Sequence, residues 1–402
     1  MGRKIHRGHR SSYGRRYNKK SSAWVQVVAW VVAAVILIPG SFFVARWIDQ
    51  GKQNVPASQN NDTTASTTVQ STTATTTQPS VVGGEQVLRG FTLPYTKLRD
   101  VKALKTLAEQ AVKDGYNSVV IELKDRDGNL YYVSETEAGK QADAQVAKAL
   151  TLKKLTDAFA VLDQAGLTPV PLLYAFEDAK APITVPGAMV TLEGNTQGRW
   201  HDDDPSKGGR PWLNPYADAA QAYIVALGEE LKLAGAGAVM LDGVYFPTQT
   251  LHADFKSGGD ASLSEAQVLK NFLSRMATAC GVPIMLRCDV NATLGNNLGG
   301  YHKNPLGFGA SAVVTDLRMS SIGDMLVVKK KMLTVSDEAM SDIASRVFDA
   351  LTPRFEKQPT QSRPASVLLL GGESAKQQIT ALTQKDDGVS YIWDGYKPAE
   401  KK

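Results

Sequence analysis

Apolar and polar positions follow two regular patterns along residues 86–402. Short, nearly continuous apolar runs are typical of buried parallel strands, and apolar side chains every three or four residues are typical of amphipathic helices. The strand-like runs occupy residues 88–94, 117–124, 169–176, 238–242, 284–289, 312–317, 366–370 and 389–394. The helical patterns fall between them, at residues 101–113, 152–164, 217–233, 265–279, 337–351 and 375–383. This alternation predicts a parallel sheet, and eight strands in roughly 315 residues predict a closed (β/α)8 TIM barrel.

An open, doubly wound sheet is the alternative arrangement of the same segments. A dinucleotide-binding sheet of that kind needs a glycine-rich phosphate turn after its first strand. Leu93, Pro94 and Tyr95 follow the first strand instead, and no P-loop pattern occurs in the chain. The count of eight strands therefore favours the barrel.

The pattern changes before residue 86. Residues 23–48 are almost entirely apolar and long enough to cross the roughly 30 Å hydrocarbon layer of a membrane. The first twenty residues hold eight lysines and arginines and no acidic residue, so the net charge of +5 is concentrated there. The positive-inside rule then predicts a cytoplasmic tail (1–22), a single-pass signal-anchor helix (23–48) and an extracellular remainder. A cleaved signal peptide is the alternative, although Phe43 is bulky for a cleavage site at residues 43–45.

Residues 49–85 are rich in threonine, serine and glutamine and have few large apolar side chains. Such a segment cannot bury enough surface to fold, so it predicts a disordered linker whose ends lie on the order of 30 Å apart. Tyr13 and Tyr17 among the arginines of the tail weakly resemble a nucleic-acid-binding arm. The adjacent membrane segment accounts for the same charges, so we expect a membrane partner and no nucleic-acid partner.

The two cysteines, Cys280 and Cys288, flank the predicted strand at residues 284–289. Five extended residues at roughly 3.3 Å each would hold them farther apart than the roughly 7 Å limit between bridged α-carbons. The sequence therefore predicts two buried free thiols and no disulfide.

Carboxylates stand at the ends of several predicted strands. Asp242 ends the apolar run 238–242, where a charge is unusual unless it serves a purpose. Side chains alternate along a barrel strand, so placing Asp242 inward brings Met240 with it. By the same reasoning an inward Glu122 brings Lys124 with it. Asp289 likewise shares its face with Arg287 on the fifth strand, and Asp316 shares its face with Arg318 beyond the sixth.

These charges would converge at the C-terminal face of the barrel, where barrel enzymes keep their active sites. Glycosidic bond cleavage needs one protonated and one ionised carboxyl group, and Asp242, Asp289 and Glu122 are the candidate catalytic residues. Sugar sites also use aromatic platforms and a few polar groups. The candidate substrate-binding residues are Lys124, Arg287, Asp316, Tyr174, Trp212, Tyr245 and Trp393. A purely structural layer of salt bridges is the alternative for the charged residues, and simple packing is the alternative for the aromatic ones.

The sequence indicates that Asp394 is a turn residue. It follows Trp393 and precedes Gly395 near the chain end, a pair that is common in turns.

Other classes of chemistry have little support. Serine, cysteine and zinc enzymes need a positioned histidine, and His201, His252 and His302 lie in predicted loops without a HExxH or nucleophile-elbow motif. The acidic run 201–204 lacks the alternating ligands and the distant glutamate of an EF-type calcium loop, which favours a solvated turn. We expect no metal site and no cofactor.

Three segments resemble a known family, the putative glycosyl hydrolase domain of many bacterial surface proteins. They are VIELKD (120–125), WLNPY (212–216) and LDGVYFP (241–247), and the similarity extends over the region after the linker. The resemblance implies a barrel related to α-glycosidases, with Asp242 as nucleophile and Asp289 as its partner. Tyr245 and Asn214 stand where the family has arginine and aspartate.

The sequence thus leads to two hypotheses. The first is a membrane-anchored extracellular glycoside hydrolase that acts on a cell-wall or surface glycan through its strand-end carboxylates. The second is a carbohydrate-binding or cell-surface interaction barrel without catalysis.

Overall fold

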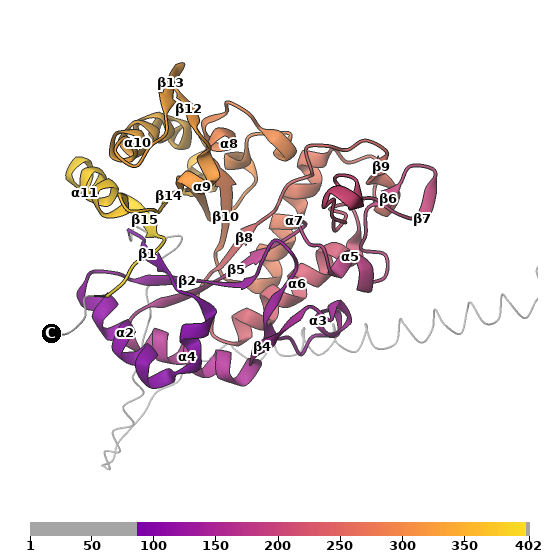
Figure 1. Cartoon of the computed structure of the whole chain (residues 1–402), viewed down its shortest axis with the longest axis horizontal. Coiled ribbons are helices and arrows are strands. Elements are labelled where there is room, and N and C mark those ends of the chain that lie inside the picture. The colour runs from indigo at the N-terminus through magenta and orange to yellow at the C-terminus, as the bar shows by residue number, and fades with distance from the viewer. Residues whose placement is uncertain (1–86, 399–402) are drawn as a thin grey trace, which may run out of the picture. The chain divides into compact units, whose positions relative to one another are not determined.

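The computed structural model describes residues 87–398, and eight parallel strands at their centre close into a barrel (Figure 1). The strands, in barrel order, are β1 (Arg89–Thr92), β2 (Ser118–Lys124), β5 (Thr168–Tyr174), β8 (Val239–Asp242), β10 (Ile284–Asp289), β11 (Ala312–Asp316), β14 (Ala365–Leu370) and β15 (Ser390–Trp393). β1 pairs with both β2 and β15, which closes the sheet. All eight predicted strands are present, and the prediction of a closed (β/α)8 barrel is confirmed.

Six long helices connect the strands at the predicted places. They are α2 (Val101–Lys113), α4 (Leu152–Ala165), α6 (Asp218–Leu233), α7 (Glu265–Cys280), α10 (Met340–Glu356) and α11 (Ala375–Lys385). Asp100, Thr151 and Ser264 begin three of them, because each side chain accepts a hydrogen bond from a backbone N–H of the first turn. Only the short α8 (Val290–Leu294) and two 3-10 turns lie between β10 and β11.

Two apolar layers follow from the alternation of side chains along the strands. The first fills the barrel and includes Val120, Leu172, Met240 and Met285. The second lies between strands and helices and includes Ile121 of β2. The predicted inward faces of these strands are therefore confirmed up to the level of Glu122 and Asp242.

Insertions extend the segments that follow the C-terminal ends of the strands. After β2 come β3 (Leu130–Val133), α3 (Glu137–Ala142) and β4 (Gln145–Thr151). After β5 come α5 (Ala181–Thr184), β6 (Thr191–Leu192) and β7 (Asn195–Arg199), and after β8 comes β9 (Ala253–Asp254). After β11 come α9 (Met319–Ile322), β12 (Met325–Val328) and β13 (Lys331–Thr334). Short 3-10 helices occupy Tyr95–Arg99, Pro205–Lys207, Lys256–Gly258, Gly299–Tyr301, Pro305–Gly307 and Thr360–Ser362. Because βα segments leave the mouth end of a barrel, most of this added structure surrounds the mouth.

The predicted tail, anchor helix and linker, and the last four residues, lie outside the described residues. Within residues 87–398, no helix has the length and apolar character needed to cross a membrane. Cys280 and Cys288 are both buried and free, as predicted.

Candidate active site

The register of the barrel brings the charged strand ends together. Tyr174 of β5 lies directly opposite Asp242 of β8, and Asp289 of β10 lies directly opposite Asp316 of β11. Opposite residues of neighbouring parallel strands share a face, so the two side chains of each pair lie side by side above the apolar interior.

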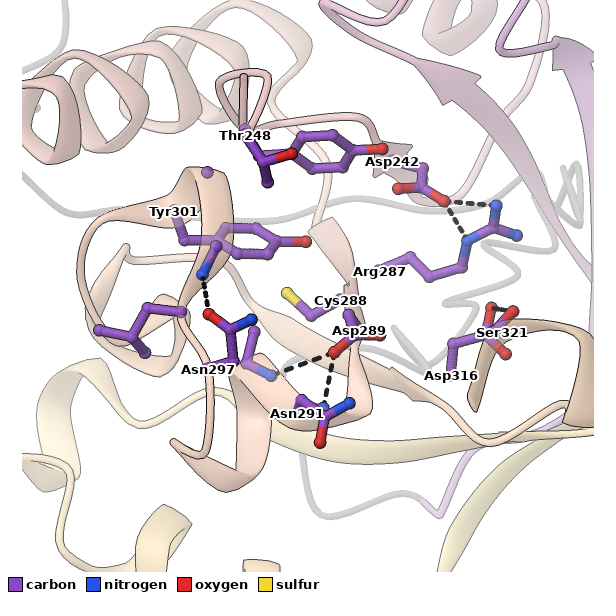
Figure 2. Close-up of a pocket in the computed structure, with 15 residues that line it drawn as sticks. Asp242, Thr248, Arg287, Cys288, Asp289, Asn291, Asn297, Tyr301, Asp316 and Ser321 are labelled. Carbon is purple, nitrogen blue, oxygen red and sulfur yellow. Dashed lines mark hydrogen bonds and ion pairs between the residues drawn. The ribbon is translucent and has the colours of Figure 1, made fainter. Parts of the chain in front are cut away.

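Arg287 connects the first of these pairs. Its guanidinium donates hydrogen bonds to Oδ2 of Asp242 (Figure 2). It also donates to the hydroxyl of Tyr174. The other carboxylate oxygen of Asp242, Oδ1, accepts the backbone N–H of Gly243 at 2.5 Å. Burial alone would lower the pKa of Arg287, but Asp242, Tyr174 and Asp316 together raise it above its usual value. Asp242 therefore sits beside a fixed positive charge.

Arg318 holds a second group of charges. It donates to both oxygens of Asp316, with Nη2 at 2.7 Å from Oδ2 and Nε at 3.0 Å from Oδ1. Its Nη1 donates to Asp394 at 3.0 Å, and Asp394 also accepts the hydroxyl of Thr92 at 2.6 Å. Burial raises the pKa of Asp316, but its hydrogen bonds with Arg318 and the charge of Arg318 prevail, and the pKa lies below its usual value.

The structure confirms the predicted turn at Asp394 and Gly395 and adds an ion pair between Asp394 and Arg318 that the turn did not predict. The signal that could have identified this role of Asp394 was its position one residue after the last barrel strand, the same kind of position that singled out the other carboxylates.

Glu122 and Asp289 differ from the three paired carboxylates. Within residues 87–398, neither forms an ion pair with lysine or arginine, and the Glu122 side chain forms no hydrogen bond. Asp289 accepts the backbone N–H groups of Asn291 at 2.7 Å and Ala292 at 3.3 Å, which caps α8. Burial raises the pKa of Glu122 and, despite these two hydrogen bonds, that of Asp289. These two acids are the mouth carboxyls whose surroundings favour the protonated form.

A cavity of about 390 Å³ opens beside these groups. Asp242, Arg287, Asp289 and Asp316 line one side, and Figure 2 shows Tyr301 and Asn297 on the other. A cavity of this size can accommodate a sugar ring, and it holds both acceptor and donor groups for hydroxyls.

A second cluster of charges lies next to this cavity, around Glu177. The carboxylate of Glu177 is buried and accepts hydrogen bonds from Arg126 at 3.0 Å, Arg210 at 2.7 Å and the hydroxyl of Tyr245 at 2.6 Å. Tyr245 and Thr248 separate the first cavity from a second one of about 440 Å³, which this cluster lines. Sequence reasoning missed the cluster, because Arg126 and Arg210 belong to insertions whose path no periodic pattern predicts.

Lys124 does not lie in the mouth as predicted. The pairing of β2 with β5 shifts between Glu122 and Lys124, so that Leu123 and Lys124 both point outward. Lys124 is fully buried, 2.8 Å from Asp178 and 2.6 Å from the carbonyl of Tyr174, beside the ring of Tyr223 on α6. A β-bulge has turned its side chain from the barrel to the helix layer.

Two predicted aromatic platforms do not line the first cavity: Trp393 faces away from it, and Trp212 lines the second. Trp393 points away from the barrel interior and packs against Tyr396, with ring centroids 5.6 Å apart. Trp212 is only 5% exposed, and its indole N–H donates to Asp202 at 2.9 Å. Tyr174 and Tyr245 remain at the site, the former bonded to Arg287 and the latter lining both cavities.

Comparison with known protein families identifies one family that the chain matches. Residues 90–297 match the family described as "Putative glycosyl hydrolase domain". No sequence among curated proteins matches the chain significantly.

Several solved structures are similar. The glycoside hydrolase domain of PgaB (BpsB) from Bordetella bronchiseptica matches with a TM-score of 0.53 and 11% identity, over 78% of this chain and 94% of that one. A hypothetical protein from Ruminiclostridium thermocellum matches with a TM-score of 0.41 and 20% identity, over 49% of this chain and 96% of that one. The glycoside hydrolase domain of PelA from Pseudomonas aeruginosa matches with a TM-score of 0.39 and 14% identity, over 77% of this chain and 94% of that one. The likeness to the PgaB domain supports the barrel fold.

Proposed function

Because the chain belongs to the family of the putative glycosyl hydrolase domain, we propose that its barrel hydrolyses a glycosidic bond in a cell-wall or surface glycan. The proposal rests on one observation, that two carboxyl groups at the same barrel mouth have different surroundings. Asp242 lies against the guanidinium of Arg287, whereas burial raises the pKa of Glu122. Glycosidases need this division between an ionised and a protonated acid.

Each acid then has a distinct role. Asp242 supplies the negative charge that faces the anomeric carbon, and Arg287 and Gly243 fix its orientation. Glu122 gives its proton to the glycosidic oxygen as the bond from that oxygen to the anomeric carbon breaks, so the departing sugar leaves as an alcohol. Water then bonds to the anomeric carbon and returns a proton to Glu122. Asp289, which the family resemblance implies as the partner of Asp242, lines the same cavity and also has a raised pKa. It is the alternative proton donor.

One observation favours a second function, a carbohydrate-binding barrel without catalysis. Three mouth carboxylates, those of Asp242, Asp316 and Asp394, are held by arginines, and both oxygens of Asp242 already accept hydrogen bonds. A layer of ion pairs between carboxylates and arginines can be purely structural.

Activity measurements distinguish the two functions. Wild-type protein and Asp242→Asn are compared on a panel of aryl glycosides and wall polysaccharides, with Asp157→Asn on the exposed side of α4 as the matched control. We expect wild type and Asp157→Asn to turn over at least one substrate and Asp242→Asn to lose about 10³-fold or more in kcat. Equal glycan binding by all three proteins with no turnover would reject the hydrolase and support the binding function.

We also propose that the domain is anchored outside the cell by residues 23–48, with residues 1–22 in the cytoplasm. The length of the apolar run and the charge on its N-terminal side support this location. The full chain should remain in the membrane fraction after an alkaline wash, and protease added to intact cells should digest the barrel domain. Deletion of residues 23–48 should abolish both behaviours. Recovery of the full chain in the soluble fraction would contradict the proposal.

A further inference from the structure

The hairpin formed by β12 and β13 is a basic and apolar projection that the proposed reaction does not use. Its strands pair in antiparallel register, with Val327 opposite Met332 and Val328 opposite Lys331. Figure 1 shows the hairpin at the periphery of the domain, beside α10. It follows β11 and α9, so it belongs to a segment that leaves the mouth end of the barrel.

The two faces of the hairpin have different surroundings. Leu326 and Val328 point inward and are 1% and 4% exposed. On the opposite face Met325, Val327 and Met332 are 52%, 37% and 65% exposed. A short strand pair thus leaves three large apolar side chains together in solvent, which is typical of an interaction surface rather than of scattered surface residues.

The turn of the hairpin is basic and strained. Lys329 and Lys330 form the two-residue loop with φ of 48° and 66°, and Lys331 follows. Hairpin loops of this kind favour asparagine and glycine, because other residues are strained at positive φ. Residues 325–334 contain three lysines and no acidic residue. The tip therefore carries three positive charges in a conformation that local preferences do not explain.

The hairpin is connected to the candidate active site. The side-chain amide of Asn296 donates to the carbonyl oxygen of Val327 at 2.6 Å, and the next residues, Asn297 and Leu298, line the first cavity. A surface that holds the hairpin would therefore also lie beside the mouth of the barrel.

We propose that this hairpin docks on a membrane surface that carries anionic lipid headgroups. The three lysines match the charge of such a surface, and the exposed methionines and valine can enter its apolar boundary. A soluble polyanion would satisfy the lysines but leave the apolar face in water, so the combination favours a bilayer.

The predicted anchor and linker would place such a surface within reach. β1 begins at the end of the barrel opposite the mouth, so the segment before it has to be at least as long as the domain is wide if the hairpin is to face the membrane. A compact domain of this length is about 50 Å across. The fully extended segment 49–85 spans about 120 Å, which is sufficient. Docking would hold the site against glycans at the outer face of the membrane.

A fluorescent label on the hairpin tests the proposal in the full chain. Met332→Cys is labelled with an environment-sensitive dye; Cys280 and Cys288 are buried and stay unlabelled. We expect a blue shift of the dye emission with vesicles of phosphatidylglycerol and phosphatidylcholine, and none with phosphatidylcholine alone. A label at Leu233→Cys, which is exposed on α6, should not respond.

Charge reversal supplies the second arm. The blue shift of the Met332→Cys label with anionic vesicles should be lost in the K329E/K330E/K331E variant and unchanged in K102E/K105E/K113E on α2. The readout is the dye at the hairpin and not total vesicle binding, because the predicted anchor and basic tail also bind vesicles. If the first variant does not fold, added salt should reverse the blue shift of the parent. Equal responses to both lipid mixtures, or a response to soluble polyphosphate as strong as that to anionic vesicles, would overturn the proposal. None of these outcomes depends on hydrolase activity.

Discussion

At the scale of single residues, the site is defined by what lies next to each acid. Asp242 and Glu122 both point from strand ends into the barrel mouth, yet Arg287 bonds only to the former. Burial without a bonded cation leaves Glu122 with a raised pKa. The surroundings, rather than the residue types, therefore assign the two roles.

The pH dependence of activity tests the role of Glu122. An acid catalyst works only while protonated, so wild-type kcat should fall as the pH rises through the raised pKa of Glu122. Glu122→Gln should lose roughly 10²- to 10⁴-fold on substrates with poor leaving groups. It should lose much less on dinitrophenyl glycosides, whose leaving group needs no proton. If Asp289→Asn shows this behaviour and Glu122→Gln does not, Asp289 is the acid.

Stability measurements on the same variant provide the folding control. A carboxyl group whose pKa is raised in the folded state makes the protein less stable as the pH rises above about 4.3, the usual pKa of an unfolded glutamate, up to the folded pKa. Glu122→Gln removes this loss, so its Tm at neutral pH should equal or exceed that of wild type. A lower Tm would show that its lost activity reflects damage to the fold.

At the scale of elements, the bulge in β2 has the largest effect on the site. Glu122, before the bulge, stays on the inward face of β2, whereas Lys124, after it, enters the helix layer and binds Asp178 and the carbonyl of Tyr174. The bulge thus ties the end of β2 to the end of β5 and to the loop that carries Glu177.

Removal of this buried cation should be costly. Lys124→Met leaves Asp178 as an unpaired buried charge and should lower the free energy of unfolding by about 3–5 kcal/mol. K124M/D178N should recover part of the loss, because asparagine carries no charge. Lys153→Met, which breaks an exposed pair with Asp157, should cost less than about 1 kcal/mol in the same urea titration. Equal small effects of both lysine variants would contradict the structural role of Lys124.

At the scale of the whole molecule, the barrel closes through contacts between its first and last strands. β1 pairs with β15, and Thr92 donates to Asp394, 302 residues farther along the chain. Strand pairing of this range forms only when the intervening structure is in place. The barrel should therefore unfold as one cooperative unit.

The two cysteines can report this cooperativity. Burial raises the pKa of Cys280 to about 11 and that of Cys288 still further, so neither thiol should react with an aromatic disulfide reagent in the native state at about pH 8. Both should become reactive over the same range of urea in which circular dichroism is lost. Reaction of one thiol in the folded protein would show that α7 or β10 opens independently.

The sequence by itself determined the architecture and part of the candidate site. Buried parallel strands and amphipathic helices leave periodic patterns that depend only on local spacing, so eight strands and six helices could be located. Alternation along a strand also placed Arg287 and Asp242 on inward faces, and the separation across one strand predicted free cysteines.

Only the tertiary structure decided which charges meet. The bulge that turns Lys124 outward depends on the pairing of β2 with β5, and the partners of Glu177 come from separate insertions. Arg318 follows β11 and reaches Asp394, which follows β15, because both strands flank β14. Trp393 packs outward, into the layer between strands and helices. Such contacts join residues far apart in the chain, and local periodicity carries no information about them.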